Sequence, residues 1–137
     1  MKKQIILSLL FSSALLAGVR GQDYRIVFDM TSKDTINQQS VVREIGLIKG
    51  SNPDAKLEVV VYSQGLNFVL KDKSAVSADI QKILAMKDVS INICAMTMKR
   101  NNVDKADLIP GVGVVPDGIY EILLKQREGY GYIKVAH

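Results

Sequence analysis

The sequence predicts a single α/β domain in which helices cover both faces of a roughly five-stranded, mainly parallel sheet, a three-layer arrangement of the flavodoxin-like kind. Short apolar segments alternate along the chain with amphipathic ones, which is the pattern of βαβ units. Several apolar segments are too continuous for a sheet that has one face in water. Residues 22–137 are enough for one domain with a real core and too few for two.

Residues 1–21 have the features of a secretory signal peptide. Two lysines precede an apolar run over residues 5–16, and a small residue, Gly21, ends the segment. We expect export to a periplasm or out of the cell, with cleavage after Gly21 or nearer Ala17. The apolar run is short for a membrane span, so we expect no membrane attachment after cleavage. No cysteine follows the cleavage point, which argues against a lipid anchor.

The charge of the mature chain argues against nucleic-acid binding. The whole chain has a formal net charge of +4, but the signal carries three basic residues and no acidic ones, which leaves +1 for residues 22–137. A nearly neutral domain without a dense stripe of lysine and arginine has no electrostatic footprint for nucleic acid.

The first half of the mature chain predicts two strands and two helices. Residues 24–29 and 57–62 are apolar and rich in β-branched side chains, as buried strands are. Residues 35–49 and 74–86 carry apolar side chains at helical spacing. Residues 66–70 predict a short helical piece against the sheet.

The second half predicts three more strands, over residues 89–93, 112–115 and 130–135. The first of these leads to Cys94 and then into a basic segment that starts a turn of helix. A longer helix before the last strand carries its apolar residues on one side, at Ile119, Ile122 and Leu123.

The carboxyl ends of parallel strands meet at one edge of a sheet, where ligands of α/β proteins bind. The loops at that edge bring small and polar residues into one neighbourhood, namely Thr31, Ser32, Ser63, Gly65, Asn67, Cys94, Thr97 and Lys99. Some of them also have a simpler structural explanation. Gly65 suits a turn, and Asn67 and Thr97 suit helix caps. We expect Asp29, at the end of the first strand, either to orient a neighbouring side chain or to hydrogen-bond the next loop.

Cys94 is the only cysteine and the best chemical site in the sequence. Backbone N–H dipoles and neighbouring cations favour a thiolate over a thiol. Lys99 and Arg100 supply such charge, although two adjacent helical residues cannot both face Cys94. A lone thiol in an oxidising compartment is buried and inert, paired with another molecule, or reactive.

The sequence has few residues suited to other kinds of catalysis or to metal binding. The single histidine, His137, is the last residue, which removes Ser/His and Cys/His catalysis and a histidine-based zinc site. The glycines at 111 and 113 precede a strand instead of a helix and lack a third glycine, so they do not make a phosphate loop. Met96 and Met98 with the thiol suit Cu(I), but methionine more often fills gaps in a core. The sequence predicts no cofactor and no metal.

Five stretches of the chain resemble the DsrE family of sulfur-relay proteins and their exported single-domain relatives. They are residues 27–29, 62–67, 93–101, 107–112 and 128–133. The resemblance covers the mature chain and implies a DsrE-like domain over residues 22–137.

In cytosolic members of that family a cysteine carries a persulfide that passes between partners. Cys94 matches this thiol, and Arg100 matches the basic residue that follows it. Asn101 and Asn102 stand where the relay pattern has an arginine and a glycine.

The resemblance also implies partners. Members of the family form homo-oligomers, commonly trimers or hexamers, and Tyr120, Tyr130 and Tyr132 are candidate interface aromatics. A sulfur relay further implies a donor or acceptor protein.

Two functions follow from these observations. The first is an exported, thiol-based persulfide carrier in which Cys94 accepts sulfur and Lys99 and Arg100 give electrostatic support. The alternative is a non-enzymatic, oligomeric binding or assembly module with the same fold, in which Cys94 is structural.

Overall fold

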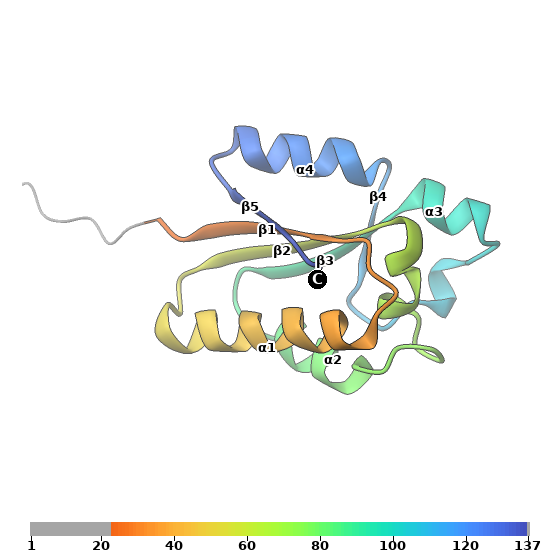
Figure 1. Ribbon diagram of the computed structural model, residues 1–137, viewed down its shortest axis with the longest axis horizontal. Helices are drawn as coiled ribbons and strands as arrows, with labels where there is room; N and C mark the ends of the chain where they lie inside the picture. Colours follow the sequence, from red (N-terminus) through yellow and green to blue (C-terminus); the bar gives the residue numbers. More distant parts are fainter. Residues whose placement is uncertain (1–22, 137) are drawn as a thin grey trace, which may run out of the picture.

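The computed structural model describes residues 23–136 and contains one sheet of five parallel strands (Figure 1). The strands lie in the order β4-β3-β2-β1-β5, and every neighbouring pair is parallel. Their bounds are β1 (Arg25–Met30), β2 (Lys56–Val61), β3 (Val89–Cys94), β4 (Gly113–Val115) and β5 (Gly131–Lys134). The predicted signal peptide and His137 lie outside the described residues.

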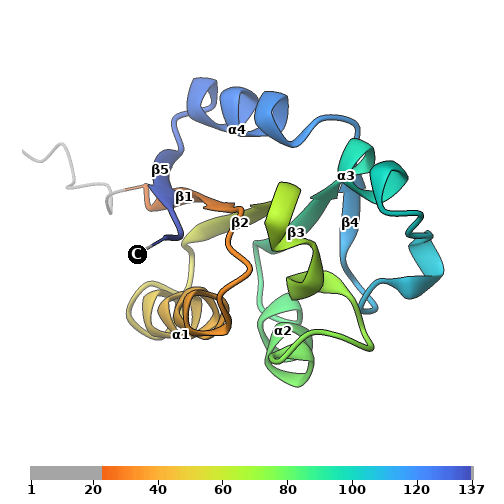
Figure 2. The same cartoon turned by 45° about the vertical axis from the view of Figure 1, so that its right-hand side comes forward.

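Helices cover the two faces of the sheet unequally (Figures 1 and 2). The helices α1 (Thr35–Ser51) and α2 (Ser77–Leu84) lie on one face, and α4 (Gly118–Arg127) lies on the other. α3 (Ala95–Arg100) continues directly from β3, and two short 3₁₀ helices, η1 (Ser63–Val69) and η2 (Lys105–Asp107), lie in the connections. Within residues 23–136 no helix has both the length and the apolarity to cross a bilayer.

This architecture confirms the predicted α/β fold with a five-stranded parallel sheet. The predicted strands and helices are present, with ends that differ by a few residues. The second amphipathic helix, expected over residues 74–86, is shorter, because the Ser74 hydroxyl accepts a hydrogen bond from the N–H of Val76 at 3.3 Å. A serine that binds backbone two residues ahead forms a turn that competes with helix.

The two faces of the sheet are packed differently. The main apolar core lies between the sheet and the α1 and α2 layer, and alternate residues of β1, β2 and β3 point into it. On the α4 face, the buried apolar cluster of the described chain is only Val27, Val60 and Ile122, with Tyr62 and Tyr130 packed against it. One helix cannot cover five strands with apolar side chains, so polar residues occupy the rest of this face.

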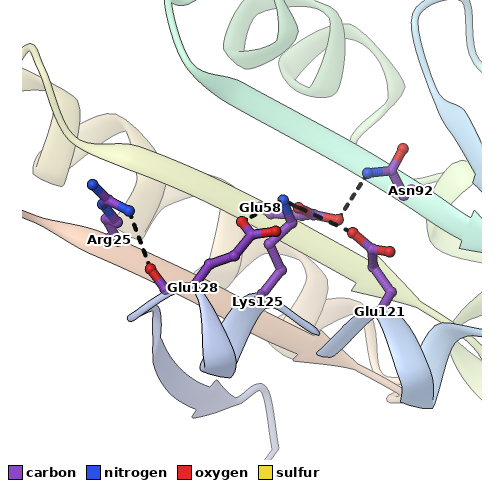
Figure 3. A network of polar contacts seen from close by, with 6 residues as sticks. All are labelled: Arg25, Glu58, Asn92, Glu121, Lys125 and Glu128. Carbon is purple, nitrogen blue, oxygen red and sulfur yellow. Dashed lines mark hydrogen bonds and ion pairs between the residues drawn. The ribbon is translucent and has the colours of Figure 1, made fainter. Parts of the chain in front are cut away.

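An ion-pair network fills the space between α4 and the middle of the sheet (Figure 3). Glu58 on β2 accepts a hydrogen bond from Asn92 on β3 at 2.8 Å and pairs with Lys125 on α4 at 3.4 Å. Lys125 also pairs with Glu128 at 3.3 Å and with Glu121 at 3.9 Å. Burial raises the pKa of Glu58, and the Asn92 bond and the Lys125 charge only partly offset it. The network ties α4 to the two central strands.

The connections after β3 and β4 leave on opposite faces of the sheet. The chain after β3 packs Leu108 and Ile109 into the main core, whereas the chain after β4 enters α4 on the other side (Figure 2). Where the connections from two neighbouring strands leave on opposite faces of the sheet, a crevice lies beyond the carboxyl ends of those strands. Cys94 and Val115 are paired at the ends of β3 and β4, so the thiol lies at this switch point.

Candidate functional site

Cys94 lies at the end of β3 on the α4 face of the sheet. The residue is 4% exposed, yet it belongs to neither apolar cluster. It is also the N-cap residue of α3, with an extended backbone, so the first N–H groups of that helix surround its side chain. Burial among backbone N–H groups is a polar environment, unlike that of a cysteine that fills a core.

The N-terminus of α4 approaches the same sulfur. Asp117 caps α4, and its carboxylate accepts hydrogen bonds from the N–H groups of Ile119 at 3.0 Å and Tyr120 at 3.1 Å. The N–H of Gly118, the first residue of the helix, is left for the Cys94 sulfur. A Cβ on Gly118 would stand 3.2 Å from the Cβ of Cys94, so only glycine allows this approach without displacement. The dipoles of α3 and α4 therefore meet at the thiol.

The Thr97 hydroxyl adds a side-chain donor. Its oxygen accepts a hydrogen bond from the N–H of Ser63 at 3.0 Å, which leaves the hydroxyl proton free for Cys94. Ser63 holds this N–H in place with a left-handed backbone, φ 54°, which a non-glycine residue adopts at a cost. This left-handed residue thus supplies the N–H that binds the Thr97 hydroxyl oxygen.

These donors decide the charge state of the thiol. Burial raises the pKa of Cys94, but hydrogen bonding from the N–H groups of Gly118, Thr97 and Met96 and from the Thr97 hydroxyl outweighs it. The net result is a pKa below the ordinary cysteine value. The Cys94 side chain does not make a capping hydrogen bond of strict geometry to α3. The nearby N–H groups of α3 still favour the thiolate over the thiol, and this preference is what lowers the pKa. A thiolate is the nucleophilic form of cysteine.

A second polar group continues along the same edge of the sheet. The Asp29 carboxylate on β1 accepts a hydrogen bond from the Tyr132 hydroxyl at 2.5 Å and lies 3.6 Å from the Lys134 ammonium. The remaining oxygen, Oδ1, has no hydrogen-bond partner among residues 23–136. Tyr62 lies between Asp29 and Cys94, and burial and the nearby Asp29 carboxylate raise the pKa of Tyr62 to about 12. Its phenol therefore stays protonated at neutral pH.

The structure brings some of the predicted site residues to the thiol and leaves others away from it. Ser63 and Thr97 contact each other beside Cys94, as expected for this edge. The Lys99 and Arg100 side chains are exposed, and neither makes an ion pair or hydrogen bond with a described residue. The groups that lower the Cys94 pKa are backbone N–H groups and a hydroxyl, so the electrostatic role of Lys99 and Arg100 stays a prediction.

The other predicted residues have structural roles or none that is visible. The Thr31 hydroxyl accepts a hydrogen bond from Lys134 at 3.3 Å, and the Ser32 hydroxyl accepts from Asn37 at 2.8 Å near the start of α1. Gly65 is required by close packing, because a Cβ there would stand 2.4 Å from the Met30 carbonyl oxygen. Its expected place in a turn is confirmed, because its N–H donates to the Tyr62 carbonyl at 3.1 Å, although the left-handed backbone of that turn lies at Ser63. Asn67 is exposed in η1.

The two methionines near Cys94 point to different surroundings. Met98 packs in the main core and Met96 is exposed. They do not gather around the thiol as a copper site would require.

Gly118 and Tyr62 are site residues that the sequence did not reveal. The only local signals are the Pro-Asp-Gly start of α4 and the position of Tyr62, which directly follows Val61, the β2 partner of Ile93. Neither signal says that these residues meet Cys94.

The model of the DsrE/DsrF-like family matches residues 14–135 of this sequence. The chain belongs to the DsrE/DsrF-like family. This family is associated with sulfur relay, and the match confirms the resemblance seen in the sequence. Among curated proteins, none matches this DsrE/DsrF-like chain.

Solved structures agree with the family assignment. MTH1491 from Methanobacterium thermoautotrophicum, a protein of unknown function, is 30% identical and superimposes with a TM-score of 0.76, over 82% of this chain and 99% of its own. The ychN protein from E. coli is 16% identical with a TM-score of 0.64, over 81% of this chain and 98% of its own. The second likeness shows the shared fold alone.

Proposed function

We propose that this DsrE/DsrF-like protein is a sulfur carrier that works outside the cytoplasm and holds sulfur as a persulfide on Cys94. The observation that carries the proposal is the set of donors around the thiol: three backbone N–H groups and one hydroxyl, which lower its pKa in spite of burial. A buried thiol with only a packing role has no need of such donors. Membership of a family associated with sulfur relay supports the same reading.

The reaction needs only the thiolate. The Cys94 sulfur attacks the terminal sulfur of a donor persulfide, R–S–SH, and a new S–S bond forms. The S–S bond of the donor breaks, and its electron pair leaves with the donor as the thiolate R–S⁻. The product is Cys94–S–SH, which keeps the donor's proton, and no external oxidant or reductant takes part. Helix N–H groups at Cys94 stabilise the thiolate before the attack, and they stabilise the persulfide anion once Cys94–S–SH has lost its proton to water.

A direct test follows the only cysteine of the chain. The rate of Cys94 alkylation in the folded protein is measured against pH, and a separate, unalkylated sample is incubated with a low-molecular-weight persulfide and weighed by mass spectrometry. We expect the alkylation midpoint below the ordinary cysteine pKa of about 8.5 and a mass gain of one sulfur atom. A Cys94→Ser variant is the control and should gain nothing. A thiol that reacts only after unfolding would overturn the proposal.

A second candidate is an oligomeric assembly module in which Cys94 is structural. The apolar side chains of Ile119, Tyr120 and Leu123 on α4 are 66%, 52% and 41% exposed. Exposed apolar residues clustered on one helix are typical of an interface with another protein. Self-association is compatible with sulfur transfer, and the alkylation test separates the two functions, because a structural Cys94 would not react in the folded protein.

A further inference from the structure

Tyr62 lies beside Cys94 under the first turn of α4. The two residues directly follow Val61 and Ile93, which are partners in the β2 and β3 ladder, so they leave the sheet next to each other. The Tyr62 ring packs against the small apolar cluster formed by Val27, Val60 and Ile122. Since Ile122 belongs to α4, the ring is held between this helix and the sheet.

The ring also lies close to the residue that donates to the thiol. A Cβ on Gly118 would stand 3.4 Å from both Cβ and Cδ1 of Tyr62, and 3.2 Å from Cβ of Cys94. Gly118 therefore has both Tyr62 and Cys94 as neighbours on the side where a side chain would be. We expect a shift of the Tyr62 ring to move Gly118 relative to the sulfur, because close-packed groups transmit small displacements.

A buried carboxylate that is incompletely satisfied lies near Tyr62. Asp29 is 3% exposed, and its Oδ2 atom already contacts Tyr132 and Lys134. Its Oδ1 atom has no hydrogen-bond partner of good geometry among the described residues. A buried carboxylate oxygen without a donor is costly, and the phenol of Tyr62 is a protonated donor on which Asp29 acts by charge and hydrogen bonding.

We propose that Tyr62 is a positioning residue: Asp29 holds its hydroxyl, and its ring fixes Gly118 so that the first N–H of α4 meets the Cys94 sulfur. Asp29 and Tyr62 then act on the thiol through the helix and do not touch the reacting sulfur. The inference deepens the proposed function and rests on it only in that Cys94 works as a thiolate.

Titratable groups from several elements surround this arrangement. They are Tyr62 after β2, Asp29 on β1, Tyr132 and Lys134 on β5, Asp117 at the cap of α4, and the exposed Lys99 and Arg100 on α3. Tyr62→Phe changes none of these charges at neutral pH, because the phenol is protonated there. Asp29→Asn removes a negative charge, which by Coulomb's law alone lowers the pKa of a nearby thiol. Loss of positioning instead raises the pKa of the thiol, so the direction of the change in Asp29→Asn shows which of the two effects is larger.

The test compares three full-length variants by the pH dependence of iodoacetamide alkylation at Cys94. We expect Tyr62→Phe to raise the alkylation midpoint and to slow the reaction at pH 7 by roughly 3- to 10-fold, as a rise of about half to one unit predicts. Asp29→Asn should raise the midpoint too, in spite of the lost charge. Tyr132→Phe is the matched control, because its hydroxyl also donates to Asp29 but its ring is not among the close neighbours of Gly118; its rate should stay within about twofold.

Each outcome decides something. An unchanged midpoint in Tyr62→Phe, or equal shifts in Tyr62→Phe and Tyr132→Phe, would overturn the positioning role. If Tyr62→Phe folds poorly, Asp29→Asn still tests the same contact from the other side, and a lowered midpoint there would count against it. Persulfide loading of the wild type is scored separately. A wild type that takes no sulfur while Tyr62→Phe shifts the midpoint would refute the carrier and leave the positioning role standing.

Discussion

Gly118 lies close to Cys94, and a side chain on its α-carbon would crowd that residue. A Cβ there would meet the Cβ of Cys94 at 3.2 Å and the Tyr62 ring at 3.4 Å, so its neighbours would have to shift by a few tenths of an ångström. Glycine therefore suits the approach of a helix N-terminus to a thiol, and its N–H is one of the donors that favour the thiolate.

The Gly118→Ala variant should therefore damage stability and thiol chemistry together. We expect a loss of about 1–3 kcal/mol in the free energy of unfolding from overpacking and a rise in the alkylation midpoint of Cys94. Gly46→Ala in α1 is the matched control, because its Cβ would meet nothing within 4 Å. It should stabilise the helix by about 0.5–1 kcal/mol and leave the midpoint alone. A Gly118→Ala protein with a normal midpoint would show that the α4 N–H does not act on the sulfur.

Spectrophotometric titration of the tyrosines should report on Asp29. Tyr62 and Tyr132 titrate at about 12, Tyr62 chiefly because of burial and Tyr132 chiefly because its hydroxyl donates to Asp29. Asp29→Asn should lower both values and lower that of Tyr132 more, since its largest cause is removed. Phenolate absorbance measured between pH 9 and 13 checks this, with Tyr62→Phe and Tyr132→Phe to assign the two steps. Equal values in wild type and Asp29→Asn would contradict the contact.

The contribution of the buried Glu58 to the stability of this protein should fall as pH rises. Burial raises the pKa of Glu58, so the folded state holds the proton more tightly than the unfolded state does. The stability contribution is present below the unfolded pKa of about 4.3 and is lost as pH rises through the folded value. Glu58→Gln has no proton to lose and keeps an acceptor for Asn92. Its free energy of unfolding, relative to wild type, should therefore grow from pH 4 to pH 7.

Urea unfolding at several pH values measures this difference. Glu44→Gln is the control, because Glu44 is exposed on α1 and pairs only with the neighbouring Arg43 in the described chain. It should show no such trend. A Glu58→Gln variant that loses stability steadily toward pH 7 would mean that the ion pair with Lys125 outweighs burial.

The exposed apolar side chains on α4 predict self-association. Light scattering on residues 22–137 should give a mass above that of a monomer. Leu123→Glu should lower that mass, because it places a charge among the exposed apolar side chains of α4. Leu47→Glu is the control: Leu47 is 61% exposed on α1, which covers the other face of the sheet, and the mass should not change. A monomeric wild type would remove the prediction, and equal effects of the two variants would place the interface elsewhere.

Much of the fold was predictable, because strand and helix patterns are local. The apolar segments that became β1, β2 and β3 are short and bounded by turn residues, and residues 35–49 have a helical apolar period that α1 confirms. The α4 pattern misled in one respect. Ile119, Ile122 and Leu123 predict one apolar helix face, yet only Ile122 is buried. The side of α4 that lies against the sheet also carries Glu121 and Lys125, which pair with each other and, through Lys125, with Glu58.

The candidate site was predictable in outline only. The rule that ligands bind beyond the carboxyl ends of parallel strands placed Ser63, Cys94 and Thr97 together, and the structure brings Ser63 and Thr97 into contact beside the thiol. The cations expected to support Cys94 are exposed, and the donors that act on it are mainly backbone N–H groups. Every residue except proline has a backbone N–H group, so no pattern of side chains predicts which of these groups will lie around the Cys94 sulfur.

By itself, the sequence of this protein determined the order of its strands and helices, the family to which it belongs, and the single thiol available for chemistry. The tertiary structure decided what surrounds that sulfur. Gly118 reaches Cys94 because α4 crosses from one edge of the sheet to the other, and Asp29 lies near Tyr62 because β1 pairs with β2, where the partner of Asp29 is Val60, two residues before Tyr62. Contacts between segments far apart along the chain depend on packing and register, which the local periodicity of side chains does not encode.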